Sequence, residues 1–258
     1  VEATLVHKGG RITNEHKKLQ KTGKLSRKFL KKLCIKLRPN EYFSLDDFIS
    51  LMIHLRVFFE IDPDTIFIPS LLPVEITDPL GKGLHEPLIC YWIHGDDEEV
   101  RILPQSYFHA LIVELLGRKG IIKLNTKRNH SRSIIQLSVV LTPCKEYRLV
   151  LVDQDFWFEV YVDKSLESKH RQFIRELIQS CTARVLEQLQ LSRLEELQYG
   201  LRCYSPECSE GVNHISMRVD QCPLRFKCLR SGEYWVEEQV ERQFWFLKGL
   251  LYTTCICV

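Results

Sequence analysis

The clearest structural pattern in the sequence is Tyr147-Arg-Leu-Val-Leu-Val-Asp-Gln-Asp-Phe-Trp-Phe-Glu-Val-Tyr-Val162. It holds two runs of β-branched and aromatic residues, which favour strands. The polar residues Asp153-Gln-Asp155 between the runs are typical of a tight turn, so we expect an antiparallel hairpin. Side chains alternate along a strand, which places Trp157, Glu159 and Tyr161 on one face and the remaining apolar residues of the second run on the other.

The neighbouring segments extend this hairpin into a larger unit. Ile134 to Leu141 is a third β-like run, and apolar side chains recur at helical spacing from about Leu166 to Leu191. A shorter helix is expected to start at Pro104. An antiparallel sheet covered by helices on one face is an α+β architecture. We therefore predict an α+β subdomain over residues 87–197.

A smaller helical subdomain is predicted upstream, over residues 23–86. Apolar positions recur at helical spacing from Leu25 to Leu37, where Pro39 ends the helix. A second helix is expected from Ser44, whose hydroxyl can cap it, to about Phe59. Phe67-Ile68 is a short β-like run. Two helices and a short strand predict a fold of winged-helix type.

The two ends of the chain show less regular patterns. Residues 1–22 have little periodicity and are predicted to be a linker. Residues 198–258 hold short β-like pieces among Cys, Pro and Gly, which predicts an appended Cys-rich β unit. The chain starts with Val1 and no signal-peptide pattern follows, so we expect a fragment of a larger protein.

Composition excludes several classes of protein. Of the 258 residues, 45% are hydrophobic and 27% charged, which is ordinary for a folded chain and excludes a largely disordered one. No apolar run approaches ~18 residues, so no membrane span is expected. Many of the ten cysteines lie in apolar periodic segments, which favours reduced thiols and a cytoplasmic location.

The charge is unevenly distributed along the chain. The total is 36 Lys and Arg against 33 Asp and Glu, but residues 1–38 alone hold twelve basic and two acidic side chains. Such a stretch can contact nucleic acid, an acidic membrane surface or an acidic domain, and the simplest interpretation is a solvated helix face. No aromatic residue lies within 1–28, so base stacking is not expected and nucleic acid is an unfavoured partner.

The motifs of common enzymes are absent from the sequence. It contains no phosphate-binding glycine loop, nucleophile elbow or zinc-protease helix, so we predict no catalytic site. Cysteine and histidine in the tail could form a closed structural zinc site, although the spacings between the cysteines are wide and plain thiols are the alternative. The favoured zinc ligands are Cys203, Cys208, His214 and Cys228.

Several phrases resemble the COR domain, the module that follows the Roc GTPase domain in Roco-family proteins. They are Gly23-Lys-Leu-Ser-Arg-Lys-Phe-Leu-Lys-Lys-Leu33, Asp47-Phe-Ile-Ser-Leu-Met52, Phe67-Ile-Pro-Ser-Leu-Leu-Pro73 and Leu103-Pro-Gln-Ser-Tyr-Phe-His-Ala-Leu-Ile-Val113. The resemblance covers about residues 23–191. It divides the chain into a COR-A-like part over 23–86 and a COR-B-like part over 87–197.

The resemblance implies a non-catalytic role in signal transduction. A COR domain supports dimerisation and relays the nucleotide state of an upstream Roc domain to neighbouring domains, and no nucleotide site is expected in this chain itself. The implied partners are the Roc domain of the same protein and a second copy of the chain. The alternative function is nucleic-acid binding by a winged helix that uses the basic helix 24–36. Exposed Trp92, Trp157, Tyr161, Trp235 and Trp245 would be contact residues for a protein partner, unless they belong to the core.

Overall fold

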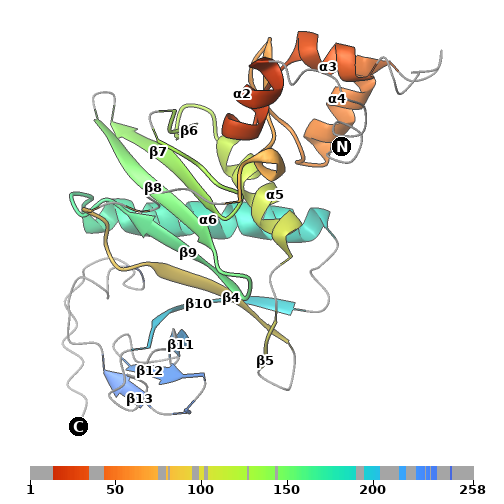
Figure 1. Ribbon diagram of the computed structural model, residues 1–258. Helices are drawn as coiled ribbons and strands as arrows, with labels where there is room; N and C mark the ends of the chain where they lie inside the picture. The colour runs from red at the N-terminus through yellow and green to blue at the C-terminus, as the bar shows by residue number, and fades with distance from the viewer. Residues whose placement is uncertain are drawn as a thin grey trace.

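The chain forms two packed units, seen in the computed structural model of Figure 1. Among the residues that the structure describes, a small unit of helices and three short strands lies at one end, and the larger unit is a ten-stranded antiparallel sheet with two helices. This arrangement confirms the predicted α+β class. The structure describes residues 14–34, 44–74, 80, 82–94, 99–101, 104–126, 128–142, 145–189, 195–203, 215–218, 225–229, 231–232, 234–236 and 245.

The small unit is built around its own apolar core. Its strands pair antiparallel in the order β1-β3-β2. Its elements are α2 (Asn14–Thr22), β1 (Lys24–Ser26), α3 (Arg27–Cys34), α4 (Leu45–His54), β2 (Phe59–Asp62), β3 (Thr65–Phe67) and the 3₁₀ turn η2 (Pro69–Leu71). The buried side chains of this core are Leu19, Leu25, Phe29, Leu30, Cys34, Ile49, Phe58, Ile66 and Ile68.

The start of the small unit differs from the prediction in two places. Residues 14–22, expected in a linker, form α2, because Leu19 is buried in the core and the ring of His16 packs edge-on against Phe29 at 4.8 Å. Residues 1–13 lie outside the described part. The segment that starts at Leu25, expected to be helical, begins as strand β1, in which Leu25 pairs with Ile66.

Gly23 makes this strand possible. Its φ is +63°, and its carbonyl accepts the N–H of Ile68 at 2.8 Å. A Cβ at this position would lie 2.9 Å from the Ile68 carbonyl oxygen, so the backbones approach too closely for a side chain.

The second helix starts as predicted and ends early. The Ser44 hydroxyl accepts the N–H of Asp47, and the Asp47 carboxylate accepts the N–H of Ser44, which is a capping box. The helix was expected to reach about Phe59 but α4 ends at His54, because Arg56 has a left-handed φ of 55° and turns the chain into β2.

The larger unit is one antiparallel sheet in the order β13-β12-β11-β10-β4-β9-β8-β7-β6, with β5 also paired to β4. Its strands are β4 (Leu88–His94), β5 (Glu99–Arg101), β6 (Ile122–Leu124), β7 (Ile134–Thr142), β8 (Lys145–Asp153), β9 (Trp157–Val162), β10 (Glu195–Arg202), β11 (Ile215–Arg218), β12 (Arg225–Cys228) and β13 (Tyr234–Val236). The predicted hairpin is present as β8 and β9, with Val150 opposite Tyr161.

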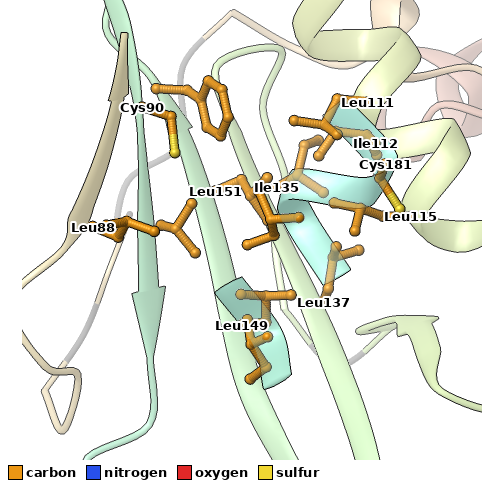
Figure 2. Packing of buried hydrophobic residues seen from close by; sticks show 14 of the residues in the cluster. Leu88, Cys90, Leu111, Ile112, Leu115, Ile135, Leu137, Leu149, Leu151 and Cys181 are labelled. Carbon is orange, nitrogen blue, oxygen red and sulfur yellow. The ribbon is translucent and has the colours of Figure 1, made fainter. Parts of the chain in front are cut away.

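Helices α5 (Gln105–Leu116) and α6 (Ser168–Gln188) cover one face of this sheet. Figure 2 shows strand side chains facing the two helices across a core of buried hydrophobic residues. The labelled residues are Leu88, Cys90, Ile135, Leu137, Leu149 and Leu151 from strands, and Leu111, Ile112, Leu115 and Cys181 from helices. The alternation predicted for β9 is confirmed, since Phe158 and Val160 belong to this core and Trp157 and Tyr161 do not.

The C-terminal strands continue the same sheet. β10 pairs with β4 on one side and β11 on the other, so the predicted boundary between residues 197 and 198 falls inside a strand. The described strands of the Cys-rich segment therefore extend the main sheet.

Candidate interaction site at the junction of the two units

Glu114 on α5 joins the two units through a cluster of arginines. The Arg56 guanidinium, from the small unit, donates to Glu114 Oε2 from Nη2 at 2.7 Å and from Nε at 2.8 Å. Arg184 of α6 and Arg118, which lies in the turn just after α5, approach Oε1 at 3.4 and 3.5 Å. The Glu114 side chain is only 11% exposed, so its charge needs these partners.

The residues on both sides of Arg56 are apolar and exposed. Leu51 and Leu55 are one helical turn apart, Val57 follows Arg56, and Ile61 lies on β2. These four side chains, called here the 51–61 apolar group, are between 38% and 44% exposed. A protein partner that covered this group would also contact the chain on both sides of Arg56.

A second set of contacts holds the units together beside η2. Arg132 donates from Nε to the Leu72 carbonyl and from its backbone N–H to the Pro73 carbonyl, both at 2.9 Å. The Arg132 carbonyl accepts from Nε2 of His109 on α5 at 3.1 Å. Burial lowers the pKa of His109, which favours the neutral ring that makes this bond.

His130 fixes the loop that carries Arg132. Its Nδ1 accepts the backbone N–H of Gln136 at 3.2 Å, so its Nε2 carries the hydrogen and donates to the Asn125 carbonyl at 2.9 Å. Burial lowers the pKa of His130 to about 4. The loop is buried at His130 and Ser131 because these bonds hold it against the sheet.

The opposite face of the sheet carries a polar network beside a pocket of about 470 Å³. Glu159, fully buried, accepts from Tyr161 at 2.6 Å, from Trp157 Nε1 at 3.3 Å and from Arg202 at 3.1 Å. Burial, and then the hydrogen bond to Glu159, raise the pKa of Tyr161. The Tyr161 hydroxyl is therefore not poised as a base near neutral pH. The pocket is lined by Leu80, Lys82, Gly83, Leu84, His85, Glu86, Pro87, Tyr161, Lys164 and Arg202.

The predicted zinc ligands are described only in part. Cys203 follows β10 and is half-buried. Cys228 is buried at the end of β12, where its Sγ accepts the N–H of Ser231 at 3.5 Å. Cys208 and His214 lie outside the described residues. No metal-binding group of His, Cys, Asp or Glu occurs among the residues that the structure describes, and zinc binding stays a prediction. Stoichiometric zinc in the purified protein would support it.

The aromatic contact residues expected from the sequence belong largely to the interior. Trp245 and Tyr161 are buried and Trp157 is half-buried. The side chains of Trp92 and Trp235 lie outside the described part.

The 51–61 apolar group is not apparent from the sequence, because Leu51 and Leu55 are part of the apolar pattern around α4. The available signal is that this pattern surrounds most of the helix, whereas a single core-facing stripe needs less than half of it.

No protein-family model matches the chain, and no curated protein matches it either. The resemblance to COR domains is therefore carried by the quoted phrases and stays a prediction. No helix within the described residues is long and apolar enough to cross a membrane.

Proposed function

We propose that the chain is a regulatory interaction module of COR type, without catalytic activity of its own. The observation that carries the proposal is the segment Leu55-Arg56-Val57. Two exposed apolar side chains flank an arginine whose guanidinium is held by Glu114 in the other unit. A partner bound at the 51–61 apolar group can therefore influence the contact between the units, which is what a relay requires.

We also propose that the small unit is of winged-helix type, and the order of its elements supports this. The order α2, β1, α3, α4, β2, β3 with strands arranged β1-β3-β2 is the order expected for a winged helix. In the alternative function, nucleic-acid binding, the second helix of the helix-turn-helix enters the major groove. Here that helix is α4, which carries Asp46 and Asp47 and no Lys or Arg. Its charge favours a protein partner over a phosphate backbone.

We propose that the partner at the 51–61 apolar group is a second copy of the chain. The test is sedimentation velocity over a range of protein concentrations, on the unchanged chain and on Leu55→Glu. The unchanged chain is expected to exchange between monomer and dimer, and Leu55→Glu to stay monomeric at the same concentrations. Phe156→Glu is the matched control, because Phe156 is 46% exposed and lies in the distant β8–β9 turn. A chain that remains monomeric well above micromolar concentration would contradict this proposal.

The parent protein, in this proposal, is a cytoplasmic Roco-type signalling protein with a Roc GTPase domain before residue 1. The chain would then couple the nucleotide state of that domain to its neighbours. The sequence upstream of Val1 tests this directly. A phosphate-binding loop there would support the proposal, and a coding sequence with no GTPase motif there would contradict it.

A further inference from the structure

Helices α2 and α3 present lysines on their outer faces. In α3 the residues Phe29, Leu30 and Cys34 are buried, and the lysines occupy the opposite side of the helix. In α2 the buried residue is Leu19, and the lysines of this helix are exposed. The six exposed lysines, called here the lysine face, are Lys17, Lys18, Lys21, Lys28, Lys31 and Lys32.

Acidic side chains do not neutralise the lysine face in the described structure. Among the described residues none of the six lysines makes an ion pair. Glu15 is the one acidic residue between 14 and 34. Arg27 is the one arginine in that range, and it is turned to Asp46 and Glu60 at 3.4 and 2.9 Å. The lysine face therefore presents a concentrated and uncompensated positive charge.

The chemistry of the lysine face separates its candidate partners. Within 14–34 no large apolar side chain is exposed, and protein interfaces are depleted in Lys and rich in aromatic residues. The face has no aromatic ring for base stacking and no free guanidinium fork for paired recognition of a phosphate. Lysine ammonium groups on flexible stems suit a dense layer of anionic headgroups, which needs charge and no fixed geometry.

The position of the lysine face also fits contact with a surface. Figure 1 shows α2 and α3 at the end of the molecule that is farthest from β11–β13. Residues 1–38 hold twelve basic and two acidic side chains, which leaves 24 basic and 31 acidic in the rest. A negatively charged plane would therefore attract this end of the molecule and repel the other.

We propose that the lysine face binds the surface of a membrane rich in anionic lipid. The binding is peripheral and electrostatic, and the α+β unit points away from the bilayer. It is independent of the proposed contact through the 51–61 apolar group, which lies on α4, on β2 and on the turn between them.

The test is co-sedimentation of the chain with vesicles of phosphatidylcholine containing about one third phosphatidylserine, at about 0.1 M salt. The substitutions Lys28→Gln, Lys31→Gln and Lys32→Gln, combined in one variant, are expected to weaken binding on the order of a hundredfold, because each lysine contributes about fivefold near such a surface. Gln has nearly the helix propensity of Lys, so α3 should remain folded. Lys17→Gln, Lys18→Gln and Lys21→Gln form a second variant on α2 with the same expected loss.

The matched control combines Lys119→Gln, Lys164→Gln and Lys169→Gln, three exposed lysines of the α+β unit. It removes the same charge and is expected to bind vesicles as the unchanged chain does. Equal losses in the control and the α3 variant would overturn the proposal, as would absent binding or equal binding to pure phosphatidylcholine. Duplex DNA or RNA that displaces the chain from vesicles at equal phosphate concentration would assign the face to nucleic acid instead.

Discussion

The pair Arg56–Glu114 gives the sharpest test of the junction between the units. Its side chains are 22% and 11% exposed, between the exposed pairs that contribute about 0–1 kcal/mol and the buried pairs whose disruption costs about 3–5 kcal/mol. We expect Arg56→Ala to lower the free energy of unfolding by about 2 kcal/mol. Glu114→Ala should cost at least as much, because it leaves three arginines facing one another.

The left-handed backbone at Arg56 has a free-energy cost that can be measured separately from the ion pair. Its φ of 55° costs a residue with a side chain about 1 kcal/mol relative to glycine. Arg56→Gly loses the ion pair but releases this strain, so it should be less destabilising than Arg56→Ala by about 1 kcal/mol. Equal losses in the two variants would show that the left-handed conformation carries no cost here.

A double-mutant cycle measured by urea unfolding separates the pair from the effects of each truncation. We expect a coupling free energy of about 1–2 kcal/mol for Arg56 and Glu114. The control is the surface pair Lys123–Glu146, whose charged atoms are 3.4 Å apart and whose side chains are 56% and 55% exposed. It should couple by less than about 0.5 kcal/mol. If Arg56 and Glu114 couple no more strongly than this surface pair, the junction is not held by Glu114 and the proposed relay loses its basis.

Three further predictions concern stability. Gly23→Ala should lower the free energy of unfolding by about 3 kcal/mol, and Gly120→Ala by about 1 kcal/mol. Both glycines have a positive φ, but only at Gly23 would the added Cβ clash with backbone. Equal losses would refute the close approach of the Gly23 and Ile68 backbones. The pKa of His130 is lowered to about 4 in the folded state. As the pH falls from about 6.5 to about 4, His130 therefore binds a proton in the unfolded state but not in the folded state. Stability should drop by about 3 kcal/mol over that window, and His130→Gln should flatten the drop; an unchanged pH profile in that variant would contradict the assignment. Glu159→Gln should cost about 2–3 kcal/mol by thermal unfolding, because it leaves the Arg202 charge without its carboxylate, and a neutral effect would show that the network is dispensable.

Much of the fold follows from local patterns. The strands around Asp153 alternate so regularly that the hairpin, its faces and the covering helix could be predicted, because each depends on periodicity within one segment. The capping box at Ser44 is equally local. The end of α4 was not predictable in this way. The apolar residues continue to Phe59, and the chain turns at Arg56, a non-glycine residue with a left-handed φ that no residue pattern marks. The guanidinium of Arg56 pairs with Glu114, which is distant in sequence.

The candidate site depends on contacts between segments, which periodicity does not encode. That Leu51 and Leu55 are exposed follows from the face of α4 that the rest of the small unit occupies.

The α+β class, the separate small unit, the cap of α4 and the basic bias of the N-terminal part can all be read from the residue order, because propensity, capping and charge act within one segment. The folded arrangement is needed to see which lysines remain without acidic partners, how Glu114 joins the units, and that β10 connects the C-terminal strands to the main sheet. These features are contacts between segments that are distant in sequence. The free energy of such a contact depends on how deeply its groups are buried and how far apart they lie, and residue spacing along the chain does not give either quantity.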